Sequence, residues 1–334
     1  MTKGLYRVAV FFCLSYILAV VPAYGGGPQG VALLYPQDKS LVEAKLISVV
    51  VYLGDSDADM VIIARNGREI ENVPVPKGQK YICKVITIDV GHNEIGVRVV
   101  KGGSTVESKQ VSVFFRSDLS KKFAIKPSDY NKKPFHNEDG EKACASCHRM
   151  ELTEKDSKPD KPEDSLCYQC HKRITSYPFI HGPVVKWACL TCHNKDSRPF
   201  KYMTPKPDKD LCFSCHKEKK AEWVTKKYIH GPTARGTCTL CHNPHASEHP
   251  YWLKKATWNL CVTCHEEMGK GKHMLKPFAI PNKTHPTRGI PDPSRPGKMI
   301  SCASCHNPHA SNAKFLFAYE VPTIYDLCKK CHKF

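Results

Sequence analysis

Sixteen of the 18 cysteines in this chain of 334 residues follow one pattern. Two cysteines three positions apart are followed at once by a histidine, and this C-x-x-C-H signature occurs eight times. The chain holds 17 histidines in all, so eight occurrences at one offset exclude chance. The cysteines are Cys144, Cys147, Cys167, Cys170, Cys189, Cys192, Cys212, Cys215, Cys238, Cys241, Cys261, Cys264, Cys302, Cys305, Cys328 and Cys331, and the histidines are His148, His171, His193, His216, His242, His265, His306 and His332.

This spacing suits covalent attachment of haem c. Two cysteines on one turn of chain can add to the two vinyl groups of the porphyrin as thioethers. The adjacent histidine then lies beneath the ring and ligates the iron as the proximal ligand. Zinc is the competing interpretation, because CxxC pairs also build four-cysteine sites. Zinc has no need of a histidine at the fifth position, so the sequence predicts eight haem c groups per chain.

The signatures alternate between two types, and we number them one to eight along the chain. Odd ones stand in contexts such as WACLTCHN, and even ones have leucine before the first cysteine, as in DLCFSCHK. One odd and one even signature form a module, and there are four modules in residues 136–334. This region resembles the doubled-CxxCH family of multihaem c-type cytochromes. The resemblance implies electron transfer between redox proteins in anaerobic respiration.

Further histidines follow the same repeat. His136, His181 and His230 each stand eight residues before the first cysteine of an odd signature, and His285 stands 17 residues before it. We expect these four to be distal axial ligands, because two histidines on one iron give a haem suited to electron transfer. Apart from His92, which falls in a β-rich region, eight histidines remain for eight irons. These distal candidates are His136, His181, His230, His245, His249, His273, His285 and His309.

The heptapeptide CHNPHAS occurs twice, at 241–247 and 305–311, and supplies His245 and His309. Each lies three residues after a signature histidine, too close to reach the other face of the same iron. We expect them to ligate the even haem of their own module. Modules one and two have Glu151 and Asp196 at this position. Their even haems would then take His249 or His273, take Met150 or Met203, recruit a neighbouring chain, or stay open.

The rest of the chain must position these groups. Residues 28–116 contain β-rich runs separated by turn signals such as Asn66-Gly67, which predicts an all-β sandwich. The stretch IDVGHNEIGVRVV resembles a hairpin of bacterial immunoglobulin-like modules, and Cys83 is expected to be a buried strand residue. Residues 117–135 are polar and lysine-rich, as in a linker. Residues 136–334 are expected to form short helices and loops with little regular secondary structure, packed around the haems.

Residues 1–23 have the pattern of a signal peptide, with an apolar run of 14 residues that is too short to span a membrane. No later segment predicts a transmembrane span. The chain is therefore expected to be exported to the periplasm or the outer cell surface. Its formal charge of +18 would suit nucleic acid. Sixteen haem propionates offset most of that charge, so we exclude nucleic acid as a partner and expect, at most, a basic patch for an acidic redox protein.

The favoured function is an octahaem electron carrier that works with other cytochromes and with quinol-oxidising or terminal reductase complexes. One alternative is a multihaem reductase with an open haem, acting on nitrite, hydroxylamine or tetrathionate. Enzymes of that kind often replace the signature histidine by lysine, whereas all eight signatures here keep histidine. The other alternative is self-association into a filament in which chains exchange histidine ligands. An electron-transfer protein is favoured over an enzyme.

Overall fold

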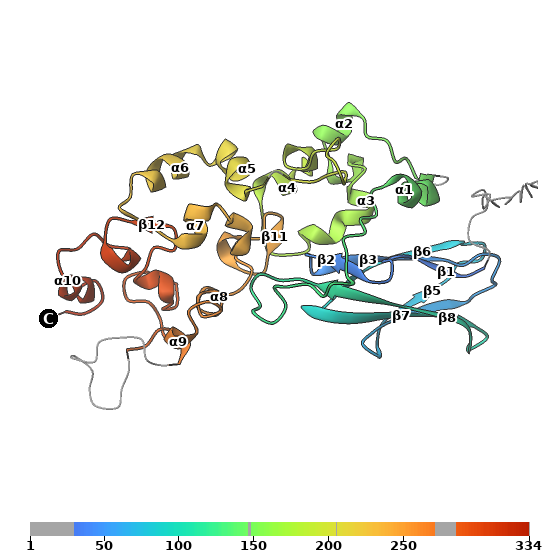
Figure 1. Cartoon of the computed structure of the whole chain (residues 1–334), viewed down its shortest axis with the longest axis horizontal. Coiled ribbons are helices and arrows are strands. Elements are labelled where there is room, and N and C mark those ends of the chain that lie inside the picture. The colour runs from blue at the N-terminus through green and yellow to red at the C-terminus, as the bar shows by residue number, and fades with distance from the viewer. Residues whose placement is uncertain (1–29, 146–147, 205, 271–284, 334) are drawn as a thin grey trace, which may run out of the picture.

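The computed structural model describes residues 30–145, 148–204, 206–270 and 285–333. The expected signal peptide, Cys147 and His273 lie outside these ranges. The described chain has an all-β part at one end of the long axis, with α1 to α3 (residues 138–171) alongside it (Figure 1). The later short helices extend toward the other end, where the chain ends beyond α10 (Ile324–Cys328). The predicted fold class is therefore confirmed for both parts.

Eight strands form two sheets in the β part. One sheet has the order β1-β3-β6 and the other β2-β8-β7-β4-β5, antiparallel except where β2 joins β8. The two sheets face each other as a sandwich. Their bounds are β1 Ala32–Tyr35, β2 Ser40–Val42, β3 Leu46–Tyr52, β4 Met60–Arg65, β5 Arg68–Pro74, β6 Tyr81–Thr87, β7 Gly91–Lys101 and β8 Ser104–Phe115.

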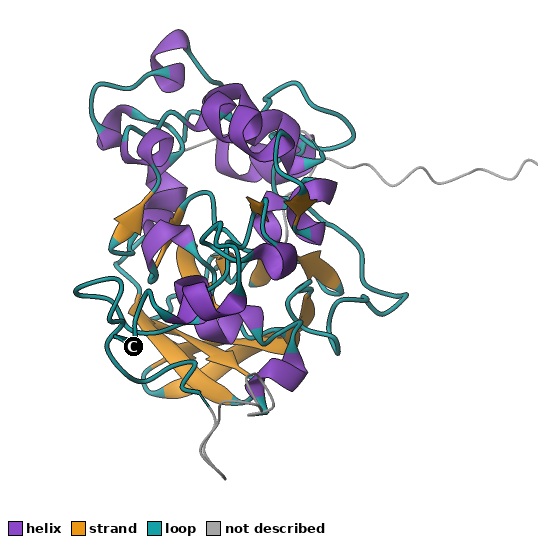
Figure 2. Ribbon diagram, turned by 90° about the vertical axis from the view of Figure 1, so that its left-hand side faces the viewer, coloured by secondary structure: helices purple, strands orange, loops and turns teal. Residues whose placement is uncertain are grey.

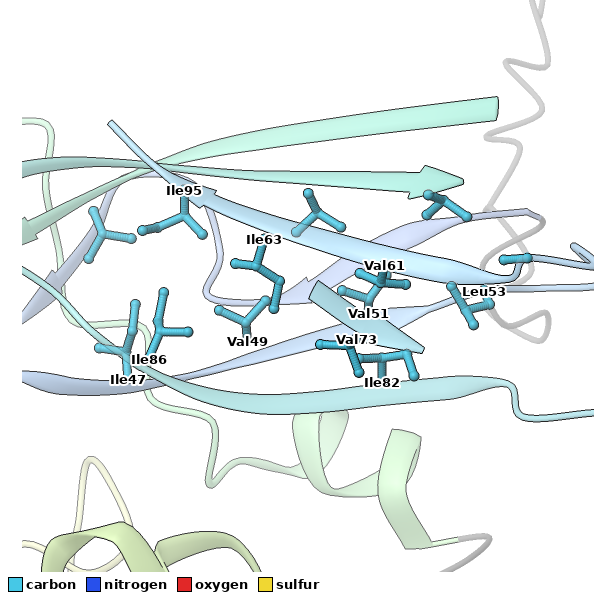
Figure 3. Packing of buried hydrophobic residues seen from close by; sticks show 14 of the residues in the cluster. Ile47, Val49, Val51, Leu53, Val61, Ile63, Val73, Ile82, Ile86 and Ile95 are labelled. Atoms are coloured by element: carbon cyan, nitrogen blue, oxygen red, sulfur yellow. The ribbon is translucent and has the colours of Figure 1, made fainter. Parts of the chain in front are cut away.

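The core of the sandwich lies between the sheets (Figure 3). Val49 and Ile86 reach it from one sheet, and Ile63 and Ile95 reach it from the other; all four are at most 1% exposed. Strand β7 alternates buried and exposed residues along most of its length, which is the period-two pattern of a strand with one face in a core. Apolar burial on this scale is the main stabilising contribution to this part.

The Asn66-Gly67 turn signal in the β part is confirmed by the structure. Asn66 and Gly67 both have positive φ, 52° and 78°, as the tight β4–β5 hairpin requires. The sequence analysis missed β2 and β5, because β2 has three residues and β5 is a largely polar edge strand.

The expectation that Cys83 is a buried strand residue was wrong. Its side chain lies on the exposed face of β6. Partial desolvation of the thiol raises its pKa to about 11, and the nearby Cys144 and Cys170 contribute to the increase.

The linker packs against the sandwich. Phe123 and Tyr130 join Leu41 and Phe114 in a second small apolar cluster. Phe123 lies so close to Gly91 that a Cβ there would be 2.7 Å from its ring, so glycine is required at that position. Polar contacts join the sandwich and linker to the helical part: Arg173 donates to the carbonyl of Val85, and Lys121 pairs with Glu266 at 2.9 Å.

The remainder consists of short elements joined by loops (Figure 2). Because a helix this short buries little surface of its own, it depends on what packs beside it. The helices are α1 Glu138–Ala145, α2 Glu154–Ser157, α3 Tyr168–His171, α4 Gly182–Val185, α5 Asp208–Cys215, α6 Lys217–Val224, α7 Gly231–Arg235, α8 Thr257–Cys261, α9 Glu266–Gly269 and α10 Ile324–Cys328. The strands are β9 Phe179–Ile180, β10 Tyr228–Ile229, β11 Ala246–Ser247 and β12 Ala310–Ser311. Single 3-10 turns occupy Pro162–Asp164, Lys172–Thr175, Cys189–Thr191, Cys238–Leu240, Pro250–Trp252, Cys302–Ser304 and Lys314–Leu316.

Candidate haem-binding sites

Every signature folds as one helical turn. The backbone N–H of the histidine donates to the carbonyl of the first cysteine four residues earlier, as at Cys189–His193 (3.0 Å) and Cys212–His216 (2.9 Å). The same bond closes the turn in all eight signatures, at 2.9–3.1 Å. A helical turn brings residues three and four apart onto one face. The two thiols and the imidazole are therefore presented together, as a haem held by two thioethers and a proximal histidine requires.

Each even signature histidine faces a second histidine from the start of its own module. His181 and His216 have ring centroids 6.2 Å apart with the ring planes 22° apart. The other three pairs are His136–His171 (6.2 Å, 30°), His230–His265 (6.1 Å, 27°) and His285–His332 (6.1 Å, 77°). In the first three modules the paired histidines are 35 residues apart in the sequence.

Two odd signature histidines also face a second histidine, but that histidine comes from the following module. His193 of module two lies 6.0 Å from His245 of module three, with the planes 12° apart. His242 of module three lies 6.0 Å from His309 of module four, again at 12°. The second histidine of each CHNPHAS heptapeptide thus reaches back to the preceding module.

The separation of these rings fits a shared iron. An imidazole nitrogen binds a metal at about 2.0–2.1 Å and lies about 1.1 Å from the centre of its ring. Two imidazoles on opposite faces of one iron should therefore have centroids about 6.3 Å apart. The six pairs at 6.0–6.2 Å match this value closely. The residues present fit an axially ligated haem in both donor type and spacing.

Hydrogen bonds orient three of the odd signature rings. The Nδ1 atoms of His193, His242 and His306 lie 2.7–2.8 Å from backbone carbonyls nine residues later. Those carbonyls belong to residues with positive φ, at Tyr202, Tyr251 and Phe315. When Nδ1–H donates to a carbonyl, Nε2 is left to bind metal. The sequence analysis missed these acceptors, because a backbone carbonyl has no residue-type signal.

Desolvation favours the neutral imidazole at the paired histidines. Burial lowers the pKa of His245 to about 4, and the nearby His193 lowers it further. Burial likewise holds the pKa of His309 at about 4, with His242 the next cause. Trp223 stacks on the His309 ring at 4.3 Å and 10°. Neutral imidazole is the form that ligates iron, so these rings are prepared for that role at physiological pH.

Short strands set the position of the histidines that cross between modules. Strand β11, which follows His245, pairs with β9, which precedes His181. The His181 N–H donates to the His245 carbonyl at 2.9 Å. Strands β12 and β10 repeat the arrangement, with the His230 N–H donating to the His309 carbonyl at 2.9 Å. The two ladders therefore place His245 against module two and His309 against module three.

The expectation that His245 and His309 face the even signature of their own module was wrong. His245 lies beside His193 of the preceding module, not beside the even signature of its own module, which faces His230. The even signatures of modules one and two face His136 and His181. For these haems the sequence analysis had considered His249, His273, Met150, Met203, a neighbouring chain or an open site. The physical reason lies in the docking of the modules, because the β9–β11 and β10–β12 ladders hold His245 and His309 against the preceding module.

The remaining histidines are placed as follows. His306 stacks on Phe317, with centroids 5.3 Å apart. His148 is exposed, and none of the histidine ring pairs among the described residues includes it. His249 is half-buried at the start of the Pro250–Trp252 turn and is not part of the six pairs, and His273 lies outside the described residues. His92 packs edge-on against Phe114 in the β part.

The attachment cysteines of successive signatures are neighbours. Between modules, the first cysteines come within hydrogen-bonding distance in the pairs Cys167–Cys189, Cys212–Cys238 and Cys261–Cys302. Within modules, the second cysteines lie close together in the pairs Cys192–Cys215, Cys241–Cys264 and Cys305–Cys331. Cys83 lies near both Cys144 and Cys170 of module one. The cysteines of signatures two to eight are therefore neighbours in chain order, and Cys83 lies between signatures one and two.

Buried aspartates hold the turns around the signatures. Asp156, which is 1% exposed, accepts two bonds from Arg149 at 2.8 and 3.0 Å and one from the Leu166 N–H at 2.9 Å. The Arg149 contact, aided by Thr153, lowers the pKa of Asp156 far below its usual range. Asp208 similarly accepts from the Thr239 N–H at 2.8 Å, which ties α5 to signature five.

Space for a planar group is present beside signature four. A cavity of ≈ 500 Å³ lies between α5, α6 and α7. Phe213 and Ser214, the two residues between the signature cysteines, line it together with Trp223 and Ile229. The described residues bring no three histidine, cysteine or carboxylate side chains together around a point that would hold a single metal ion.

Comparisons with known proteins agree with this geometry. The family model of the doubled CXXCH motif matches residues 134–175, 181–221, 230–270 and 295–334. The four repeats indicate a multihaem c-type cytochrome, and the doubled motifs imply covalently bound haem c. Such a protein has other redox proteins as partners. No helix among the described residues has the length and apolar character needed to cross a membrane.

Solved structures share similarity with about a quarter of the chain. A fibronectin(III)-like module of CbhA from Clostridium thermocellum is 18% identical, covering 25% of this chain and 94% of that one, with a TM-score of 0.21. An engineered protein is 15% identical over 25% of this chain and 19% of its own, with a TM-score of 0.22. The extracellular domain of mouse leukocyte-associated immunoglobulin-like receptor 1 is 12% identical over 24% and 91%, with a TM-score of 0.20. No curated protein matches the chain.

Proposed function

We propose that this protein is an exported octahaem cytochrome that passes electrons between redox partners in anaerobic respiration, with most of its haems ligated by two histidines. The observation that carries the proposal is the set of six histidine pairs at 6.0–6.2 Å, each including a signature histidine. An iron with two strong axial ligands exchanges electrons but does not bind substrate. Paired imidazoles also keep the potential below that of a histidine–methionine haem.

The order of the cysteine contacts supports transfer along the chain. Thioether bonds form at the porphyrin edge, so neighbouring cysteines such as Cys167 and Cys189 bring two porphyrin edges together. Contacts between modules alternate with contacts within modules, as at Cys192 and Cys215. We infer a single file of haems from signature one, beside the sandwich, to signature eight in the C-terminal helices. Electrons enter or leave at its two ends.

The haem bound by each signature supplies the redox chemistry, and the chain sets its properties. The helical turn fixes the thiols and the proximal imidazole, and the carbonyls of Tyr202 and Tyr251 hold the odd rings in one orientation. Lysine side chains provide charge opposite the propionates, so the assembled surface is far less basic than the sequence alone. The β sandwich contains no C-x-x-C-H signature and is proposed to be a docking module.

Haem content and spin state of the purified, exported protein test the proposal. The pyridine haemochrome should give about eight haems per chain, and whole-protein mass should show all of them covalently bound. EPR of the oxidised protein should be dominated by low-spin ferric iron. Protein-film voltammetry should show reversible uptake of up to eight electrons. Correctly exported protein without covalent haem would refute the proposal.

A further inference from the structure

The odd signatures of modules two and three share one arrangement, which we call the rule for odd signatures, and module one differs from it. In modules two and three, the odd signature histidine faces a histidine three residues beyond the next odd signature, as in His193–His245 and His242–His309. By this rule His148 of signature one should face residue 196. Asp196 stands there. Its carboxylate is 73% exposed and pairs with the adjacent Lys195 at 2.9 Å.

The backbone after Asp196 also takes another course. In modules three and four the same segment extends into β11 or β12 and reaches the preceding module. In module two it folds back on itself. The Ser197 hydroxyl donates toward the carbonyls of Asn194 (2.8 Å) and Phe200 (2.7 Å), and the Tyr202 N–H donates to Asn194 at 2.8 Å. No two-residue ladder to module one forms among the described residues.

Module two nevertheless docks on module one in the usual way. The Tyr202 ring covers the His136 ring edge-on at 4.7 Å, just as Trp252 of module three covers His181 at 5.0 Å. Lys201 of module two pairs with Glu141 of module one at 2.6 Å. Part of the contact between the modules is therefore kept, whereas the two-residue ladder and the side chain that would ligate iron are changed. His148 itself is exposed, whereas His193 and His242 are half-buried.

We propose that the haem bound at His148 has an exchangeable sixth ligand and is the site at which this protein binds small molecules that coordinate iron. Such ligands are carbon monoxide or nitric oxide on ferrous iron, and cyanide or azide on ferric iron. The inference rests on the proposed function, because it requires covalent haem at signature one. It adds a ligand-binding site to the electron-transfer chain and locates it at the end nearest the sandwich.

Carbon monoxide is the probe, used on the reduced, fully loaded chain. Because His306 of signature seven also lies outside the six histidine pairs, the readout is the difference from the wild-type chain. Asp196→His restores the residue that the rule requires. It should lower the carbon monoxide bound, and the high-spin EPR signal of the oxidised protein, by about one haem per chain. Asp196→Asn is the matched control and should leave both unchanged. The double variant Cys144→Ala/Cys147→Ala should contain one haem fewer than wild type and bind about one carbon monoxide molecule fewer.

The outcomes separate this inference from the proposed function. Eight low-spin haems with no carbon monoxide binding would overturn the exchangeable site while leaving the electron carrier intact. Binding that is as high as in wild type in Asp196→His or in the double cysteine variant would overturn its location at signature one. A protein with no covalent haem would instead refute the proposed function. Because the spectra are read directly, none of these results depends on an activity.

Discussion

His245 is the most informative residue to change, because its predicted target lies in another module. It faces His193 at 6.0 Å, and its own module has a different histidine, His230, opposite the even signature. In His245→Ala the iron at signature three should lose its sixth ligand. One haem should therefore change from low-spin to high-spin, which lowers the integrated low-spin EPR signal by the contribution of one haem per chain.

Carbon monoxide binding measures the same change in the reduced protein and should rise by about one molecule per chain. His249→Ala is a matched control, because this histidine lies four residues further along the same segment but outside the six ring pairs. It should leave the spin state unaltered. Imidazole added to His245→Ala should restore the low-spin signal by filling the space that the side chain vacates.

A double-variant test identifies the haem. Removing the haem at signature three by Cys189→Ala/Cys192→Ala should make His245→Ala silent, because the affected iron is gone. Removing the haem at signature six by Cys261→Ala/Cys264→Ala should leave the effect of His245→Ala intact. The opposite pattern would show that His245 serves the even haem of its own module, and the reasoning from ring geometry would be wrong.

Three other outcomes are expected. The ring planes of His285 and His332 are 77° apart, whereas the other pairs are within 30°, so His285→Ala should remove a strongly anisotropic low-spin EPR signal and leave the ordinary rhombic signals in place. Its persistence would contradict the pairing. Asp156→Ala should destabilise the protein by roughly 3 kcal/mol at pH 7 in denaturation followed by the haem absorbance. Because the folded pKa of Asp156 is lowered, its contribution is present above about pH 4 and lost as pH falls through the folded pKa, so the difference between variant and wild type should shrink in acid. A difference that stays constant would refute this. Ile63→Ala, at a fully buried position, should cost about 3 kcal/mol in unfolding of the sandwich while the haem spectra stay unchanged.

The sequence by itself determined the chemistry of the sites. The eight signatures, the alternation of odd and even types and the module repeat were all visible in residue types and spacing. Turn signals such as Asn66-Gly67 and alternating apolar residues also predicted the β part, because a strand with one buried face has a period of two. The buried strand position expected for Cys83 failed, since nothing local distinguishes the core face of β6 from the face toward module one.

Only the tertiary structure decided which histidine faces which iron site. His181 has a fixed spacing to both signatures of its module, 12 residues to His193 and 35 to His216, so the repeat alone does not choose between them. In the structure His181 faces His216, and the β9–β11 ladder places His245 beside His193. Ligation joins residues distant in sequence, and their meeting depends on how modules dock. The spacing of histidines and cysteines within the sequence of one module does not predict that docking.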